Sequence, residues 1–308
     1  MTSRILIPLD GSPMAEEVLL YVKQLAAGLK LQPTLLRVIE PTPEEIRSRM
    51  GGKAPSPIPE VARKEAEQYL EKISTYLGKS VPSPRAVVVD GDPAVEIIAE
   101  AEKSPLAIVA MSTHGRSGLA RWLIGSVAEK VLLYSSNPLL LVHPKPRSPI
   151  ATEPKLTTLL VPLDGSTVAE QVLPHVVELG KGLGISVVLV RVTWSLADYY
   201  SHLDTTDAYG AVPHVDYTQI AKEVDDDAMN YLKVCSAKLS QQGVRKVSEH
   251  LAHGDPAAAI VSLADETPNS LIAMTTRGRT GLARTLLGSV ADRVVRHSGE
   301  PVFIVRPK

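Results

Sequence analysis

The sequence predicts an α/β protein of two repeated doubly wound domains, each with a mainly parallel five-stranded sheet flanked by helices. Two observations carry this prediction. Short apolar runs such as RILIPLD alternate with segments of helical periodicity, which is typical of strands buried on both faces of a parallel sheet. The same series of motifs also occurs twice in 308 residues, a length sufficient for two domains.

The repeat can be followed from motif to motif. IPLDGS at Ile7–Ser12 returns 154 residues later as VPLDGS at Val161–Ser166. MSTHGRSGLARWLIGSVAEKVL, which begins at Met111, returns 163 residues later as MTTRGRTGLARTLLGSVADRVV at Met274. A period of this length indicates a duplicated domain, because solenoid repeats are far shorter.

The change in offset places an insertion of nine residues in the second half, between Thr193 and Gly254. The segment HPKPRSPIATEPK is short and proline-rich, as expected of a linker. We therefore expect one domain at residues 1–146 and a second at residues 155–308.

The elements of the first half are expected in alternating order. Ser12 and Asp92 are suitable N-caps, and Pro13 and Pro93 suit the first helical position that follows each cap. The proline-rich stretch at 41–60 is expected to be a loop. The predicted strands cover residues 4–10, 34–40, 85–90, 106–112 and 138–144, and the predicted helices cover 13–30, 60–76, a segment from 93 and 125–134.

The composition argues against several classes of protein. The net charge is −1, and positive and negative residues are interspersed, so neither nucleic acid nor an anionic membrane is an expected partner. The single cysteine, Cys235, forms no disulfide within one chain and is expected to be a small apolar residue on a helix. No apolar run approaches the roughly 20 residues of a membrane helix, and no secretory signal is evident. These features predict a cytoplasmic protein.

Two motifs are expected at the carboxyl ends of the strands, where doubly wound sheets bind ligands. Asp10, after the first strand, can accept hydrogen bonds from sugar hydroxyls or a base amine. Gly115 and Gly118 let backbone N–H groups approach a ligand, and Gly125–Ser126 opens a helix whose N-terminus favours an anion. The combination predicts a nucleotide site. The alternative is structural, with glycines that only form a turn and an aspartate that only braces it.

With these motifs the chain resembles a tandem member of the universal stress protein family, over nearly all of both halves. The family's nucleotide signature is Gly, two residues, Gly, nine residues, and Gly followed by Ser or Thr. Gly115 with Gly125–Ser126 matches its latter part, and Gly278 with Gly288–Ser289 matches it again. The first glycine of the signature falls on Ser112 and Thr275, where this sequence departs from the family.

The resemblance implies an adenine nucleotide as a regulatory ligand of the stress response: ATP, or ADP or AMP, with Mg²⁺ bound only through the phosphates. It implies that Asp10 and Asp164 meet the ribose and adenine, and that Val38 and Val192 offer backbone contacts. The expected nucleotide-binding residues are Pro8, Leu9, Asp10, Val38, Ser112, His114, Gly115, Arg116, Gly118, Gly125, Ser126 and Val127 in the first half, and Pro162, Leu163, Asp164, Val192, Thr275, Arg277, Gly278, Arg279, Gly281, Gly288, Ser289 and Val290 in the second.

The resemblance also implies an intrachain pseudo-dimer, joined through the last strand of each half, and allows a homodimer of chains. A protein partner that reads the nucleotide state is expected, but the sequence does not identify it. Because Ser112 is smaller than Thr275, the first site is expected to bind more tightly. An aromatic segment that begins at Trp194 is the counter-argument, since it could stack on adenine in the second half.

Other functions remain open from the sequence. One is a scaffold that binds no nucleotide and acts through protein interactions, and another is a slow ATPase. A dedicated enzyme is not expected, because there is no P-loop lysine and because His114, a possible base, is replaced by Arg277 in the second half. A phosphoacceptor is not expected either, because His253 stands where the first half has Asp90. The histidines show no metal-ligand spacing, so no metal site from protein side chains is predicted.

Overall fold

The computed structural model describes residues 4–42, 47, 59–104, 107–114, 124–144, 154–195, 217–276 and 287–307. The chain divides into two compact units. The first contains Met1–Lys155 and also Pro301–Arg306, which includes the last strand of the chain. The second contains Leu156–Leu282 and Leu287–Glu300.

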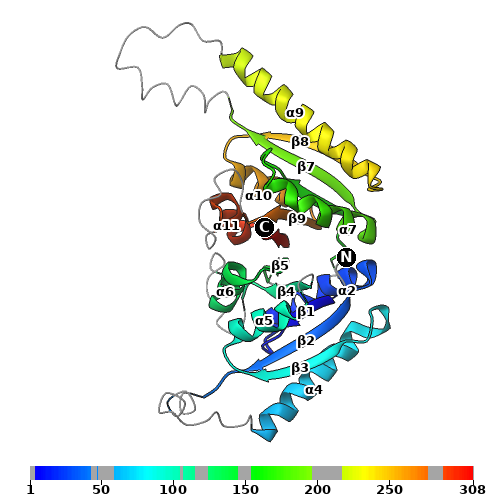
Figure 1. Ribbon diagram of the computed structural model, residues 1–308, viewed down its shortest axis with the longest axis vertical. Helices are drawn as coiled ribbons and strands as arrows, with labels where there is room; N and C mark the ends of the chain where they lie inside the picture. The colour runs from blue at the N-terminus through cyan, green and yellow to red at the C-terminus, as the bar shows by residue number, and fades with distance from the viewer. Residues whose placement is uncertain are drawn as a thin grey trace. The chain divides into compact units, whose positions relative to one another are not determined.

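The first unit alternates strands and helices along the chain (Figure 1). Its elements are β1 (Arg4–Pro8), α1 (Pro13–Glu16), α2 (Leu19–Leu29), β2 (Gln32–Ile39), α4 (Glu60–Leu77), η1 (Gly78–Ser80), β3 (Arg85–Asp90), α5 (Pro93–Glu102), β4 (Ile108–Ser112), α6 (Ser126–Tyr134) and β5 (Leu139–Val142), joined by β10 (Val302–Val305).

The second unit repeats this order. Its elements are β6 (Thr158–Pro162), η2 (Ala169–Val172), α7 (Leu173–Leu183), β7 (Ser186–Thr193), α9 (Tyr217–Gln241), β8 (Val247–His253), α10 (Pro256–Glu266), β9 (Ser270–Thr275) and α11 (Ser289–His297).

The strand order confirms the predicted doubly wound fold. In the first unit it is β3-β2-β1-β4-β5-β10, and in the second it is β9-β6-β7-β8. All pairs from β3 to β5 and from β9 to β8 are parallel, whereas β10 pairs with β5 in the antiparallel direction. Leu6 of β1 is paired with Thr34 of β2 on one side and with Val109 of β4 on the other. The chain therefore reverses its direction of winding between β1 and β4.

The local signals of the sequence place the helix starts. Ser12 caps α1, because its Oγ accepts a hydrogen bond from the N–H of Ala15 at 3.1 Å. Asp92 caps α5 by accepting from the N–H groups of Ala94 and Val95, and Asp255 caps α10 by accepting from the N–H of Ala258 at 2.8 Å. In each case proline follows the cap, at the position where a missing N–H costs no helical hydrogen bond.

The predicted helix at 13–30 is wrong in one respect, because the chain breaks it after Glu16 and begins again at Leu19. The N–H groups of Tyr21 and Val22 both bond to the carbonyl of Val18, whose side chain is fully buried. The second unit has a short 3₁₀ turn, η2, before α7 at the equivalent place. The break therefore belongs to the fold rather than to one local sequence.

The core consists of the strands and the helix faces that cover them. Ile5, Leu6 and Ile7 of β1 are completely buried, as the continuous apolar run predicted. Cys235 is a free thiol buried in α9, which confirms the small apolar role expected for it. Among the described residues, no helix has the length and apolar character needed to cross a bilayer; the cytoplasmic location stays a prediction.

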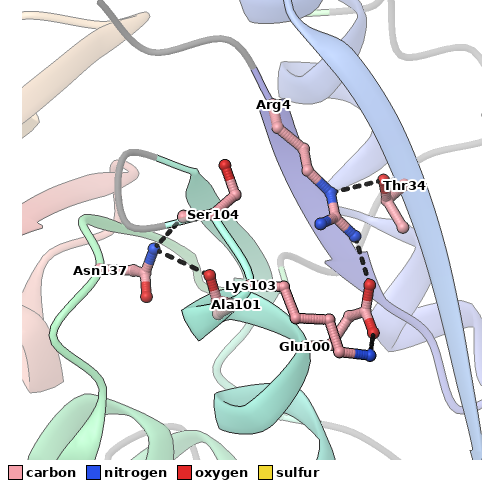
Figure 2. A network of polar contacts seen from close by, with 7 residues as sticks. All are labelled: Arg4, Thr34, Glu100, Ala101, Lys103, Ser104 and Asn137. Carbon is pink, nitrogen blue, oxygen red and sulfur yellow. Dashed lines mark hydrogen bonds and ion pairs between the residues drawn. The ribbon is translucent and has the colours of Figure 1, made fainter.

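A charged network around the buried carboxylate of Glu100 secures the amino-terminal end of β1 (Figure 2). Arg4 donates from Nε to Oγ1 of Thr34 at 2.8 Å and from Nη2 to Oε1 of Glu100 at 2.5 Å. Lys103 Nζ lies 2.5 Å from the other carboxylate oxygen of Glu100. The residue Glu100 is only 2% exposed. Burial alone would raise the pKa of Glu100, but the bonds and charges of Lys103 and Arg4 hold it below its ordinary value.

Figure 2 also shows Asn137, just before β5, whose Nδ2 donates to the backbone carbonyls of Ala101, near the end of α5, at 3.4 Å and of Ser104 at 3.0 Å. The same Nδ2 lies 3.0 Å from the carbonyl of Ala107. The network is specific to the first half. At the repeat-equivalent positions the second half has Thr158 for Arg4 and Leu263 for Glu100.

This difference gives a test of the ion pair. We expect Glu100→Leu to lower the free energy of unfolding of the first unit by about 3 kcal/mol, because Arg4, whose side chain is only 13% exposed, loses its carboxylate partner. The double variant Arg4→Thr/Glu100→Leu installs the residues of the second half and should recover most of that loss. Urea denaturation followed by circular dichroism measures both, with Glu102→Leu, an exposed neighbour on α5, as the control.

The stabilisation that Glu100 contributes is expected to decrease at low pH. Since the pKa of Glu100 is lowered from 4.5, the contribution of the carboxylate is fully present above pH 4.5 and disappears as the pH falls through its folded-state pKa. The difference in the free energy of unfolding between wild type and Glu100→Leu should therefore become smaller as the pH falls below 4.5. A double variant as unstable as the single one would contradict the ion-pair argument.

Candidate functional site

The reversal of winding creates a cavity at the carboxyl ends of the strands in the first unit. Loops that leave β1 and β4 diverge there, which is where open α/β sheets bind ligands. The cavity measures about 540 Å³. It is lined by Pro8, Leu9, Asp10, Gly11, Ala15, Leu36, Arg37, Val38, Ile39, Glu40, Ala62, Glu65, Ala66, Tyr69, Pro93, Ile97, Met111, Ser112, Thr113, His114, Gly125, Ser126, Val127 and Ala128.

The second unit has a smaller cavity, of about 290 Å³, at the same place in its own sheet. Each of its lining residues is the repeat-equivalent of a residue that lines the first cavity. They are Pro162, Leu163, Asp164, Ala169, Val190, Val192, Pro256, Ile260, Met274, Thr275, Thr276, Gly288, Ser289, Val290 and Ala291.

The predicted site residues come together wherever the structure describes them. Pro8, Leu9, Asp10, Val38, Ser112, His114, Gly125, Ser126 and Val127 all line the first cavity, and Pro162, Leu163, Asp164, Val192, Thr275, Gly288, Ser289 and Val290 all line the second. Gly115, Arg116, Gly118, Arg277, Gly278, Arg279 and Gly281 lie outside the described residues. Trp194 is described and about half exposed, but it does not line the second cavity.

The turn after β1 is built around Asp10. Its Oδ1 accepts from the backbone N–H of Ser12 at 2.9 Å and from the Ser12 hydroxyl at 2.6 Å. Gly11 has φ +82°, a left-handed conformation that favours glycine, and a Cβ there would lie 3.8 Å from the Arg37 guanidinium. Arg37 in turn donates to the carbonyl of Leu9 at 3.1 Å. Asp10 therefore braces its own turn and also borders the cavity.

The second unit reproduces this turn closely. Asp164 Oδ1 accepts from the N–H and the hydroxyl of Ser166 at 2.9 Å and 2.6 Å, Gly165 has φ +81°, and Arg191 donates to Leu163 at 3.3 Å. The duplication has thus preserved the structural role of the aspartate in both halves.

The N-terminus of α6 faces the same cavity. Gly125 has no side chain to cap the helix, and its own N–H donates to the carbonyl of Thr113 at 2.7 Å. The first intrahelical bond runs from Glu129 to Gly125, so the N–H groups of Ser126, Val127 and Ala128 precede the helical ladder. These N–H groups and the helix dipole favour an anion. Gly288, Thr276 and Asp292 repeat the pattern at α11.

Close packing explains the glycine at 125. A Cβ there would lie 3.1 Å from the Thr113 carbonyl oxygen, and this backbone oxygen cannot move aside as a flexible side chain would. His114, 6% exposed, follows Thr113, and its Nδ1 lies 3.0 Å from the Thr113 hydroxyl. The His114 and His143 rings are 6.3 Å apart between centroids. Arg306 stands at the position equivalent to His143.

Two equivalent tyrosines, of which Tyr69 lines the first cavity, were missed by the sequence analysis. Tyr69 of α4 donates from its hydroxyl to Oε1 of Glu16 at 3.0 Å, and Tyr231 of α9 donates to Glu170 at 3.2 Å. Burial raises the pKa of both tyrosines, and the carboxylates raise it further, so both stay protonated donors. The 154-residue spacing of Glu16 and Glu170 was the available signal. Glu40 and Glu65, which also line the first cavity, were missed as well.

A duplicated doubly wound unit with a braced aspartate turn and a glycine-led helix at one cavity defines a class of small α/β domains. Comparison with known proteins identifies the class more narrowly. The Universal stress protein family matches residues 1–143 and again residues 155–306, so the chain belongs to that family.

Individual relatives agree with this assignment. A universal stress protein of Mycolicibacterium smegmatis is 24% identical over 308 residues, which covers 99% of this chain and 97% of the relative. One from Methanocaldococcus jannaschii is 31% identical over 154 residues, 49% of this chain and 94% of its own length. The crystal structure of a universal stress protein from Archaeoglobus fulgidus shares the fold with a TM-score of 0.69 and 22% identity, over 98% of both chains.

The left-handed glycine in each aspartate turn gives a paired test. We expect Gly11→Ala and Gly165→Ala each to destabilise their own unit by about 1–2 kcal/mol, because a Cβ is disfavoured at this φ. Thermal denaturation of the two variants and of the wild-type chain measures the effect. The argument fails if Gly11→Ala is as stable as wild type, since that would mean the turn relaxes without strain.

Proposed function

We propose that the chain is a regulatory adenine-nucleotide-binding protein of the stress response, with ATP, ADP or AMP in the first cavity and a weaker site in the second. The observation that carries the proposal is the first cavity itself. It brings a carboxylate, the end of a strand and an anion-favouring helix N-terminus to one place at the switch point of the sheet. Its volume of about 540 Å³ lies within the range of small-molecule sites.

The described residues fit the parts of a nucleotide. In the proposed arrangement the base lies against the backbone at Val38 and the ribose lies near Asp10. The phosphates lie at the N–H groups of Ser126 and Val127, because the N–H of Gly125 already bonds to Thr113. Mg²⁺ accompanies the phosphates of ATP. The roles of Gly115, Gly118 and their second-half counterparts stay predictions.

A second candidate function is a scaffold that binds no nucleotide. It is favoured by one observation: Asp10 and Gly125 both have structural roles that account for their presence without a ligand. The two functions are separated by denaturing the purified protein and identifying released nucleotides by chromatography, followed by calorimetry with ATP, ADP and AMP. Nucleotide in the released pool, or heat of binding, supports the regulatory function. The absence of both released nucleotide and heat of binding supports the scaffold.

The pairing of the last strand, β10, with β5 is relevant to how the two halves of the chain associate. Leu139–Leu141 of β5 pair antiparallel with Val302–Ile304 of β10 in the first unit. Arg306, just after β10, donates to the carbonyl of Leu133 in α6. We infer that β10 covers an apolar strand edge that the first half would otherwise expose, and edges of this kind promote association. The internal pseudo-dimer is the proposed reason for the duplication. Any homodimer of whole chains, and the protein that reads the nucleotide state, remain proposals too.

The matched serines at the helix N-termini test the nucleotide sites. Ser126→Glu and Ser289→Glu each place a carboxylate where a phosphate is proposed to lie, and an acidic residue is tolerated at a helix N-terminus. We expect Ser126→Glu to weaken the tighter ATP-binding phase at least about tenfold, roughly 1.4 kcal/mol, in calorimetry. Ser289→Glu should affect only a weaker phase. The ranking of the halves is wrong if Ser289→Glu alone removes the tight phase.

The edge argument predicts the behaviour of a shortened chain. Residues 1–146 lack β10, so β5 should pair with another copy and the fragment should sediment as a dimer. Leu140→Lys, which places a charge in that edge, should return the fragment to a monomer. Circular dichroism checks that the fragment is still folded, because Leu140 is completely buried. A parent fragment that stays monomeric at high concentration would show that β5 is covered in another way.

A further inference from the structure

The two cavities differ mainly at one end. Beyond the positions that they share, the first cavity extends between the end of β2 and α4, and we call this extension the annex. Its lining residues are Arg37, Ile39, Glu40, Ala62, Glu65, Ala66 and Tyr69. The second cavity has no such extension among the described residues, although β7 and α9 are described there.

The buried faces of α4 and α9 establish which residues correspond. Ala66 and Ala228, Leu70 and Leu232, and Leu77 and Leu239 are buried pairs 162 residues apart. Tyr69 and Tyr231 share the same spacing and the same bond to an equivalent glutamate. The second-half counterparts of the annex are therefore Arg191, Thr193, Trp194, Val224, Asp227, Ala228 and Tyr231, none of which lines the second cavity.

A polar bridge borders the corresponding place in the second unit, and one of its members, Thr193, is the counterpart of the annex residue Ile39. Thr193, at the end of β7, donates from Oγ1 to Oδ1 of Asp225 on α9 at 2.7 Å. Nε2 of His253, at the end of β8, lies 2.9 Å from the other carboxylate oxygen of Asp225. We call these three residues the latch. Burial alone would raise the pKa of Asp225, but the bonds from His253 and Thr193 lower it, so the carboxylate is ionised and accepts both.

The latch is positioned to determine how closely α9 approaches the strand ends. Thr193 directly follows Val192, and His253 lies three residues before Pro256; Val192 and Pro256 both line the second cavity. A second contact joins β7 to α9, because the guanidinium of Arg191 on β7 lies 5.8 Å from the centre of the Tyr231 ring on α9. The first half has Ile39, Arg63 and Asp90 at the three latch positions. Since Ile39 has no hydroxyl, the first half cannot form the Thr193–Asp225 bond.

We propose that the latch closes the annex in the second half, so that the two sites admit nucleotides of different size. The inference rests on the proposed nucleotide function, in which the base lies at the β2 or β7 side of each cavity. The first site then accepts an adenine nucleotide enlarged on its base, whereas the second accepts only a compact one. Asp225 touches no nucleotide in this arrangement; it is a positioning residue that acts through α9.

The test uses ATP and benzyl-ATP, in which the amino nitrogen of adenine carries a benzyl group. Full-length Ser289→Glu reports on the first site and Ser126→Glu on the second, each by calorimetry. The first site should bind the two ligands within about threefold of each other. The second should bind benzyl-ATP at least about tenfold more weakly than ATP. Asp225→Ala, introduced into Ser126→Glu, should remove that discrimination and leave ATP binding within about threefold.

Matched variants separate the latch from general damage to α9. Thr193→Val removes one hydroxyl from the latch at nearly constant volume and should weaken the discrimination, whereas Thr193→Ser keeps the hydroxyl and should preserve it. Asp226→Ala removes an exposed charge beside the latch and should change nothing. If Asp225→Ala does not fold, as judged by circular dichroism, the Thr193 pair decides the question.

The reciprocal exchange builds the latch in the first half. Ile39→Thr/Arg63→Asp/Asp90→His, combined with Ser289→Glu, should lower benzyl-ATP affinity at least about tenfold and leave ATP affinity within about threefold. The proposal is overturned if both wild-type sites treat the two ligands alike, or if folded latch variants keep the discrimination. In either case ATP still binds. Loss of the proposed function is a different result, because then neither ligand binds at either site and both proposals fail.

Discussion

The reversal of winding between β1 and β4 is the constraint on which the rest of the structure depends. Both strands pair in parallel, but the connection after β1 leads toward β2 and the connection after β4 leads away from it. Backbone diverges at that point, and side chains of moderate size leave a cavity. Polar groups at the two strand ends border it, because that is where the strands stop forming ladder hydrogen bonds and their connections begin.

Residues at the ends of β1 and β4 both stabilise the local backbone and border the cavity. Their repetition in the two halves therefore does not decide whether a ligand binds. Asp10 holds the turn that starts the first helix, and Gly125 fits against the Thr113 carbonyl because it has no Cβ. Both also border the cavity. A duplication preserves such residues whether or not a ligand binds, since the turn and the helix start need them in either case. The nucleotide proposal therefore rests on the cavity and the uncapped helix N-terminus, and less on the motif.

The two halves share the residues that line the second cavity and their counterparts in the first, which we call the shared floor, and they differ outside these positions. Every residue that lines the second cavity has its counterpart in the first, and the strand ends, the aspartate turn and the glycine-led helix are kept. The differences lie farther out. The Arg4–Glu100 pair exists only in the first half, and the Thr193–Asp225 bond exists only in the second, because Ile39 and Arg63 stand at its two positions in the first. Changes at the periphery alter stability and cavity extent without disturbing the parallel sheet that both units require.

The sequence by itself determined the repeat, the strand positions, the caps at Ser12 and Asp92 and the residues of the shared floor, because apolar periodicity, capping and strand-end position are local properties. Only the tertiary structure decided that Asp225 meets Thr193 and His253, and that Tyr69 meets Glu16. The physical reason is the helical period. One residue turns a helix face by about 100°, so contacts of α9 depend on an alignment that the sequence left open. The buried faces show that eight of the nine inserted residues precede Ala228 and one follows Leu239.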